Sequence, residues 1–254
     1  SYVFVSIWAL ICLLPFILVI SASFSTESIV AKEGFGLLPK GFTLSAYELV
    51  FRSPKMILGS YGVTIALTVC GTVVGLFIIA MTGYALQRKD FPFRNALSFF
   101  IYFTTLFSAG MAPTYIWVSR YLKLNGSYMA VFLQLLMSPW LIILMKNFAK
   151  SVPYEITESG KIDGAGDFKI FVSLIFPMLK PALATIGLFL AIGYWNEWYQ
   201  SSLFLSEKVS VYPLQYTLYK VVNKVNSLKS TVAGQYVDLS DLPSNGLKMA
   251  NAIL

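Results

Sequence analysis

Few side chains in this sequence have the type and spacing that catalysis requires. None of the 254 residues is histidine, and the two cysteines, Cys12 and Cys70, both lie within apolar runs. Cysteine in such a run is most often a small packing residue, and neither one belongs to a metal-binding spacing. No segment fits the phosphate-binding pattern GxxxxGK[ST]. The sequence therefore lacks the usual residues for acid–base catalysis, for metal binding and for ATP hydrolysis.

The polar residues that could act together gather in one loop, residues 153–177, between two apolar runs. Glu155 and Glu158 lie near the start of a predicted helix, where acidic side chains are favourable. Asp163 and Gly164 then break that helix. Behind the break, apolar residues recur at helical spacing and predict a second short helix with an apolar stripe. The stripe consists of Phe168, Phe171, Val172 and Ile175. We expect this stripe to face something other than lipid tails.

The elements that position this loop are predicted to be membrane-spanning helices. The sequence is 57% hydrophobic and 12% charged, whereas soluble proteins carry about 25% charge. A spanning helix needs about 20 apolar residues, and a sixth such run begins near Leu247 at the end of the sequence. The five complete runs are residues 3–24, 56–87, 95–119, 124–145 and 178–205. We predict an all-α polytopic membrane protein, with residues 1–254 forming a single transmembrane domain.

The distribution of lysine and arginine predicts the orientation of these helices. With the N-terminus inside, residues 88–94 and 146–180 carry a dense set of basic residues on the inner face. The long loops 25–55 and 206–246 then lie outside, where they could dock a partner, and residues 44–51 could form a short helix. Because the basic residues follow the membrane topology and form no arginine-rich, aromatic-interleaved patch, the net charge of +7 does not indicate nucleic-acid binding. Gly71 and Gly75 form a GxxxG pattern, which favours close helix packing.

The polar loop resembles the signature loop of permeases from binding-protein-dependent ABC importers. That family's pattern is Glu-Ala-Ala, three residues, Gly, nine residues and Ile-x-Leu-Pro. Glu158, Gly164 and Pro177 match it at the same spacing, and Asp163 and Ala165 match its extended Asp-Gly-Ala core. The sequence departs from the pattern at Ser159, Gly160, Leu174 and Phe176. Residues 84–94 and 194–198 also resemble carbohydrate-type members, and the most similar subgroup is the second permease of maltose-type and complex-oligosaccharide importers.

This resemblance implies a function that the residues alone do not. It implies the six-helix fold of type I importer permeases, in which residues 153–177 form a cytoplasmic coupling helix that docks in a groove of an ATPase subunit. The implied coupling residues are Glu158, Asp163, Gly164, Ala165, Phe168, Phe171 and Pro177. The implied partners are a homologous second permease, two cytoplasmic ATPase subunits, an external solute-binding protein, a sugar or oligosaccharide, and the lipid of a bacterial cell membrane. ATP and Mg²⁺ would bind to the ATPase subunits, and this chain would hold no cofactor.

Aromatic side chains with polar neighbours suit a sugar path, because sugars present apolar ring faces and hydroxyl groups. Glu197 is the one acidic residue in its apolar run, and such a residue is a functional candidate by default. The candidate path residues are Tyr194, Trp195, Asn196, Glu197, Trp198 and Tyr115. The alternative interpretation is that these aromatics only anchor the helices at the membrane interface.

Two other classes of membrane protein remain as alternatives. An ion-coupled secondary transporter usually needs acidic residues within its spans, and only Glu197 qualifies; a membrane-embedded enzyme would need paired acids, histidine or metal ligands. The sequence does not identify the sugar, although basic outside loops would tolerate an acidic oligosaccharide.

Overall fold

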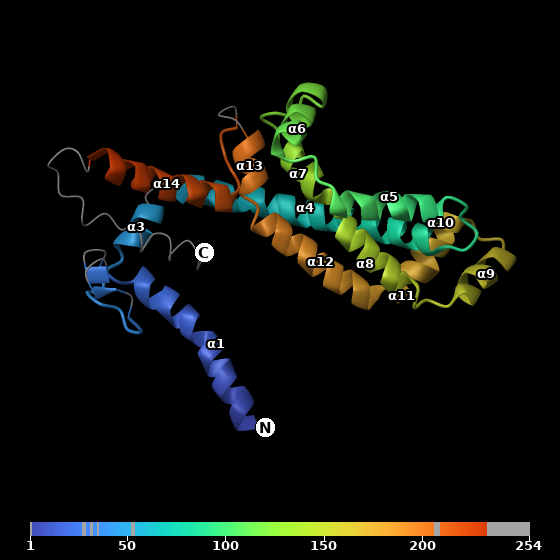
Figure 1. Cartoon of the computed structure of the whole chain (residues 1–254), viewed down its shortest axis with the longest axis horizontal. Helices are drawn as coiled ribbons and strands as arrows, with labels where there is room; N and C mark the ends of the chain where they lie inside the picture. The colour runs from blue at the N-terminus through green and yellow to red at the C-terminus, as the bar shows by residue number, and fades with distance from the viewer. Residues whose placement is uncertain are drawn as a thin grey trace. The chain divides into compact units, whose positions relative to one another are not determined.

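The computed structural model describes residues 2–26, 29–30, 33–34, 36–51, 54–205 and 209–232 (Figure 1). Within them the regular structure is helical, apart from one isolated bridge between Ser25 and Phe42. Backbone contacts divide the chain into two compact units: unit 1 is Ser1–Ser60 with Leu214–Leu254, and unit 2 is Tyr61–Pro213. This division does not test the prediction of one permease domain, which stays a prediction.

The described residues of unit 1 include an apolar span, two shorter helices and the start of a second span. Its elements are α1 (Tyr2–Ser23), α3 (Ser45–Phe51), the start of α4 (Pro54–Gln87) and α14 (Leu214–Val232). The short helix predicted at residues 44–51 is confirmed as α3. The sequence analysis missed α14. This helix buries one face, with Leu214, Thr217 and Leu218, and its sequence is too polar to be identified as a span. The sixth span expected near Leu247 lies outside the described residues.

Unit 2 contains the rest of α4 and the remaining helices. The order is α5 (Arg94–Leu106), α6 (Met111–Ile116), the π-helix η1 (Trp117–Tyr121), α7 (Tyr128–Leu136), α8 (Pro139–Ala149), α9 (Tyr154–Ile162), α10 (Asp167–Ile170), the π-helix η2 (Phe171–Ile175), α11 (Phe176–Met178), α12 (Lys180–Trp195) and α13 (Tyr199–Phe204). Figure 1 shows α9 and α10 together at the end of unit 2 that α8 approaches.

The helices are long and apolar enough for up to five spans, which agrees with the predicted all-α polytopic fold. Two are single helices, Phe4–Ser23 and Pro54–Gln87. The other three are pairs bent by 115° (α5 with α6 and η1), 40° (α7 with α8) and 85° (α10 to α11 with α12). The prediction that the fifth span continues to residue 205 is wrong, because α12 ends at Trp195 and the backbone breaks before α13.

A glycine face on α4 brings the other helices of unit 2 close. A Cβ atom at Gly71 would overlap the ring of Tyr194 on α12. At Gly75 it would lie 2.8 Å from the carbonyl oxygen of Leu136, and at Gly83 2.6 Å from Cγ of Met145. The close packing predicted from the GxxxG pattern is therefore confirmed, since only a residue without a side chain fits at these contacts.

Candidate functional site

The polar loop folds as two short helices joined by a tight turn at Gly164. The helix α9 ends at Ile162, and Gly164 has a φ of 76°, in the left-handed region. Its N–H donates to the Lys161 carbonyl (3.0 Å), and the Ala165 N–H donates to the Gly160 carbonyl (2.9 Å). These two bonds form a Schellman motif, which satisfies the last carbonyls of a helix. The predicted break at Asp163 and Gly164 is confirmed, and the backbone conformation explains the glycine.

The apolar side of the loop packs against the end of α4. Phe171 is 2% exposed, and its ring stacks on Tyr84, with the ring centroids 5.7 Å apart. It also meets the edge of Phe77 at 5.8 Å. On α9, a Cβ atom at Gly160 would lie 3.0 Å from Cγ1 of Ile170, so the two short helices touch closely as well. The loop is therefore held to its own chain by buried aromatic packing.

This packing covers one of the predicted docking residues. Phe171 is predicted to lie on a stripe that faces a partner, whereas within this chain it belongs to the core, as does Ile175, and its coupling role stays a prediction. The reason is that Phe77 and Tyr84, two turns apart on α4, supply an aromatic surface within the same chain. Of the four stripe residues, Phe168 is the most accessible, at 63% exposure.

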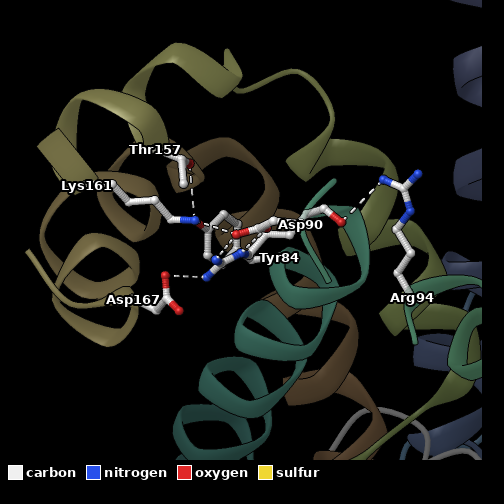
Figure 2. Close-up of polar contacts among 7 residues, drawn as sticks. Tyr84, Asp90, Arg94, Thr157, Lys161 and Asp167 are labelled. Carbon is white, nitrogen blue, oxygen red and sulfur yellow. Dashed lines mark hydrogen bonds and ion pairs between the residues drawn. The ribbon is translucent and has the colours of Figure 1, made fainter. Parts of the chain in front are cut away.

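A network of charged side chains joins the loop to the turn after α4 (Figure 2). The Arg88 guanidinium pairs with Asp90 and reaches Oδ1 of Asp167 with a 2.7 Å contact from Nη1. Asp90 also accepts from the Lys161 ammonium on α9. Nearby, the hydroxyls of Tyr84 and Thr157 are hydrogen-bonded at 3.2 Å. These contacts fasten both α9 and α10 to one end of α4, and we call them the α4 latch.

The α4 latch shifts the protonation of its members in a consistent direction. Hydrogen bonds from Arg88 and then Lys161 hold the pKa of the Asp90 carboxyl well below its usual range. The same contact with Asp90 raises the pKa of Lys161, and it raises that of Arg88 against the opposing effect of burial. All three groups are therefore charged near neutral pH, and the network can act as a fixed electrostatic fastener.

The outer face of the loop remains free for a partner. Glu158 and Asp163 are exposed on or next to α9, as predicted for docking residues. Between them Ile162 is 86% exposed, which is unusual for an aliphatic side chain at the end of a helix. The sequence analysis missed Ile162, although it lies four residues after Glu158 and so on the same helical face.

The two remaining motif residues have structural positions. Ala165 is half-buried and packs against the core beneath the turn. Pro177 lies in the first turn of α11, directly after η2 and before the 85° bend at Leu179. Because proline has no N–H to donate, it favours the end of one helical hydrogen-bond pattern and the start of another.

The predicted sugar path is only partly accessible. Tyr194 is 3% exposed, lies over Gly71 and donates its hydroxyl to the Phe132 carbonyl at 2.8 Å. It packs between α12, α4 and α7, and its predicted role as a path residue stays a prediction. Trp195 is half-buried against Tyr61, with ring centroids 6.5 Å apart.

Glu197 has a local structural role. It is 7% exposed, and its carboxylate accepts from the backbone N–H groups of Gln200 and Ser201 and from the Ser201 hydroxyl at 2.6 Å. These bonds satisfy the free N–H groups that begin α13. A direct solute contact of this buried group stays a prediction. The accessible candidates are Asn196, Trp198 and Tyr115, whose ring also stacks on Phe204 at 5.8 Å.

Comparison with known proteins places this arrangement among transport proteins. Residues 75–225 match the family described as binding-protein-dependent transport system inner membrane component. The chain is 38% identical to the polygalacturonan/rhamnogalacturonan transport system permease protein YtcP of Bacillus subtilis (strain 168), over 98% of the chain and 86% of YtcP. It is 37% identical to protein LplC of the same strain, over 96% of the chain and 81% of LplC.

A solved structure gives the same result in three dimensions. It is described as a bacterial ABC transporter involved in the import of the acidic polysaccharide alginate. The chain matches it with a TM-score of 0.79 and 31% identity, over 99% of this chain and 90% of the solved one.

Proposed function

Because the chain belongs to the family of inner membrane components of binding-protein-dependent transport systems, we propose that it carries an oligosaccharide through the membrane as a permease subunit of an ATP-driven importer. YtcP and the arabinooligosaccharide relative AraQ are both named as permease proteins, and members of this kind are not catalytic. An ion-coupled transporter is not favoured, because its one candidate acid, Glu197, is engaged by the start of α13.

The observation that supports this proposal best is the two-sided construction of the polar loop. Its inner side is fastened to α4 through Phe171 and the α4 latch, while its outer side presents Glu158 and Ile162. A partner ATPase can bind such an outer side: Ile162 would fill an apolar pocket, and Glu158 would pair with a basic side chain at the rim. The docking face then includes Ile162 and Phe168 but not Phe171.

The same construction supports a mechanism for coupling. If the ATPase subunits close and displace α9, the displacement reaches α4 directly, because α9 is tied to it by the Tyr84–Thr157 hydrogen bond and the Lys161–Asp90 pair. The η2–α11 segment conveys it to α12 through the bend at Leu179. The spans would then rock as packed bodies, as in other rigid-body transitions.

We propose an acidic oligosaccharide as the substrate class. YtcP is named for polygalacturonan and rhamnogalacturonan, and the solved relative imports the acidic polysaccharide alginate. The lysine and arginine residues of the loops predicted to lie outside would also tolerate an anionic solute. Asn196, Trp198 and Tyr115 are the accessible residues that could contact its hydroxyls and ring faces.

The proposed assembly has a homologous second permease, two ATPase subunits and an external solute-binding protein. ATP and Mg²⁺ are assigned to the ATPase subunits. In the part of the chain that the structure describes, no group of three or more histidine, cysteine, aspartate or glutamate residues could hold a metal ion.

Site-specific photo-crosslinking tests the docking face. A crosslinker at Ile162 in the full importer should capture the ATPase subunit, whereas one at the buried Phe171 should capture only this chain. A mild-detergent purification of the same sample should retain the ATPase and a second permease. Capture from Phe171 but not from Ile162 would contradict the docking face. A chain that purifies alone, without any crosslinked ATPase, would contradict the importer function.

A further inference from the structure

A cavity between α5 and α8 combines apolar walls with a basic mouth. Its volume is about 310 Å³, and α5 and α8 pack against each other around it. The walls come from Phe99 and Tyr102 on α5 and from Ile143 on α8, while Lys146 and Lys150 supply the charges. A pocket with this composition differs from the α4 latch, where every cation has an anionic partner.

The basic groups at this mouth have no carboxylate partners among the described residues. The Lys146 ammonium donates to the Ser98 hydroxyl at 2.7 Å. Arg94, at the start of α5, donates to the Arg88 carbonyl at 3.4 Å rather than to an acid. Lys150 caps the end of α8 and is exposed. Two lysines therefore line one opening, Arg94 lies close enough to repel Lys146, and a bound anion would relieve the repulsion among the three.

The position of the cavity suggests the anion's source. Helix α5 has no buried residue, and its outer surface carries Phe99, Phe100 and Phe103. Lysine at the end of a span extends its ammonium towards the headgroup region while its stem stays among apolar groups. Basic pockets between spanning helices on the cytoplasmic side are typical binding sites for anionic lipid headgroups. A soluble anion would gain nothing from the aromatic walls.

We propose that this cavity binds the phosphate of an anionic phospholipid through Lys146, Lys150 and Arg94, with an acyl chain against Phe99 and Tyr102. The assignment to the cytoplasmic leaflet rests on the proposed function, since Lys150 lies just before α9. The binding itself rests only on the cavity and its charges.

The test is native mass spectrometry of the purified full chain with added phosphatidylglycerol or phosphatidylcholine. The unaltered chain should retain phosphatidylglycerol in preference to phosphatidylcholine. The variant K146Q/K150Q should bind phosphatidylglycerol about 25-fold more weakly, at about fivefold for each lost cation. The control K169Q/K180Q removes two exposed lysines from the same region outside the cavity, with the same change in net charge, and should bind normally.

Two further variants separate a lost site from a damaged fold. K146R keeps the charge and should keep most of the binding, and K150Q alone removes an exposed side chain and should weaken binding about fivefold. Equal binding of both lipids, or unchanged binding by K146Q/K150Q, would overturn the proposal. So would displacement of the lipid by millimolar inorganic phosphate, which would identify a free-anion site instead.

The outcome is independent of the importer function. Selective phosphatidylglycerol binding by a chain that captures no ATPase would sustain the lipid site and reject the importer. Capture of the ATPase by a chain that does not discriminate between the two lipids would do the reverse.

Discussion

The polar loop and the aromatic stretch at residues 194–199 differ in how their polar side chains are paired. In the loop, charges pair across long stretches of sequence, as Arg88 does with Asp167 and Asp90 with Lys161. In the aromatic stretch, Glu197 turns back onto Gln200 and Ser201, its neighbours in sequence. Long-range pairs can pass a displacement from one element to another, whereas a local cap only holds its own turn. The difference supports motion at the first region and rigidity at the second.

The largest effect is expected where the aromatic stretch meets α4. Leucine at Gly71 would overlap the Tyr194 ring, and overpacking at such a contact costs up to about 3 kcal/mol. The melting temperature of the purified chain should fall by about 10 °C. Gly62→Leu is the matched control, because a Cβ atom at Gly62 has open space around it. Equal melting of both variants would show that the second region is not rigid.

The next effect is expected at the turn of the coupling loop. Gly164→Val forces a β-branched residue into a φ of 76°, a strain of about 1–3 kcal/mol. Uptake by reconstituted importers should fall about tenfold while ATP hydrolysis continues, because the polar loop would be displaced while the spans still pack. Gly166→Val is the control, with a φ of −68° and open space. Normal uptake by G164V would show that the polar loop does not couple ATP hydrolysis to transport.

A smaller effect should follow from opening the α4 latch. R88Q and D167N each break the 2.7 Å pair, and partly exposed pairs contribute about 0.2–1 kcal/mol. The sugar imported per ATP should fall two- to fivefold, more in R88Q than in D167N because R88Q also frees Asp90, and the double variant should match R88Q. K169Q, on the same short helix, is the control. Strictly additive losses would show that Arg88 and Asp167 act separately.

The pH dependence of the α4 latch should be confined to acid. The pKa of Asp90 is lower in the folded chain than its ordinary value of 3.8, so its stabilisation is present above about pH 4 and is lost as pH falls below that. D90N should therefore lower the melting temperature at pH 7 but make progressively less difference below pH 4. If the melting temperatures of D90N and the unaltered chain differed by the same amount at every pH, the effect of D90N would not come from the charge of Asp90.

The smallest effect is expected for solute contact. Trp198→Ala should lower uptake two- to threefold without changing the ATPase rate, because one stacking contact of an exposed ring is lost. Trp117→Ala removes a more accessible tryptophan, 56% exposed against 40% for Trp198, and should have no effect on uptake. An equal loss of uptake in both variants would indicate that Trp198 is an interfacial anchor and does not contact the solute.

The apolar runs predicted the positions of the spans, and the loop pattern predicted the helix break at Gly164. The 115° bend within residues 95–119 was not predicted, although Gly110, with a φ of 83°, and Pro113 are residues that favour a helix break. The burial of Phe171 was not predicted, because the sequence of a short amphipathic helix does not reveal which neighbour covers its apolar stripe. Ile162 was missed for a similar reason. A single aliphatic residue indicates a docking surface only when the structure shows that no neighbour covers it.

What the sequence by itself determined is the class of protein, because apolar length and turn chemistry are local properties that a chain carries at every position. It also determined the coupling motif, whose glycine is required by the backbone alone. Only the tertiary structure decided which polar groups were already satisfied. Glu197 and Arg88 are both charged residues at the end of an apolar helix. Glu197 accepts hydrogen bonds from residues within four positions of it, whereas Arg88 pairs with Asp167, 79 positions away (167 − 88). Pairing energy depends on distance in space, and that distance exists only in the folded chain.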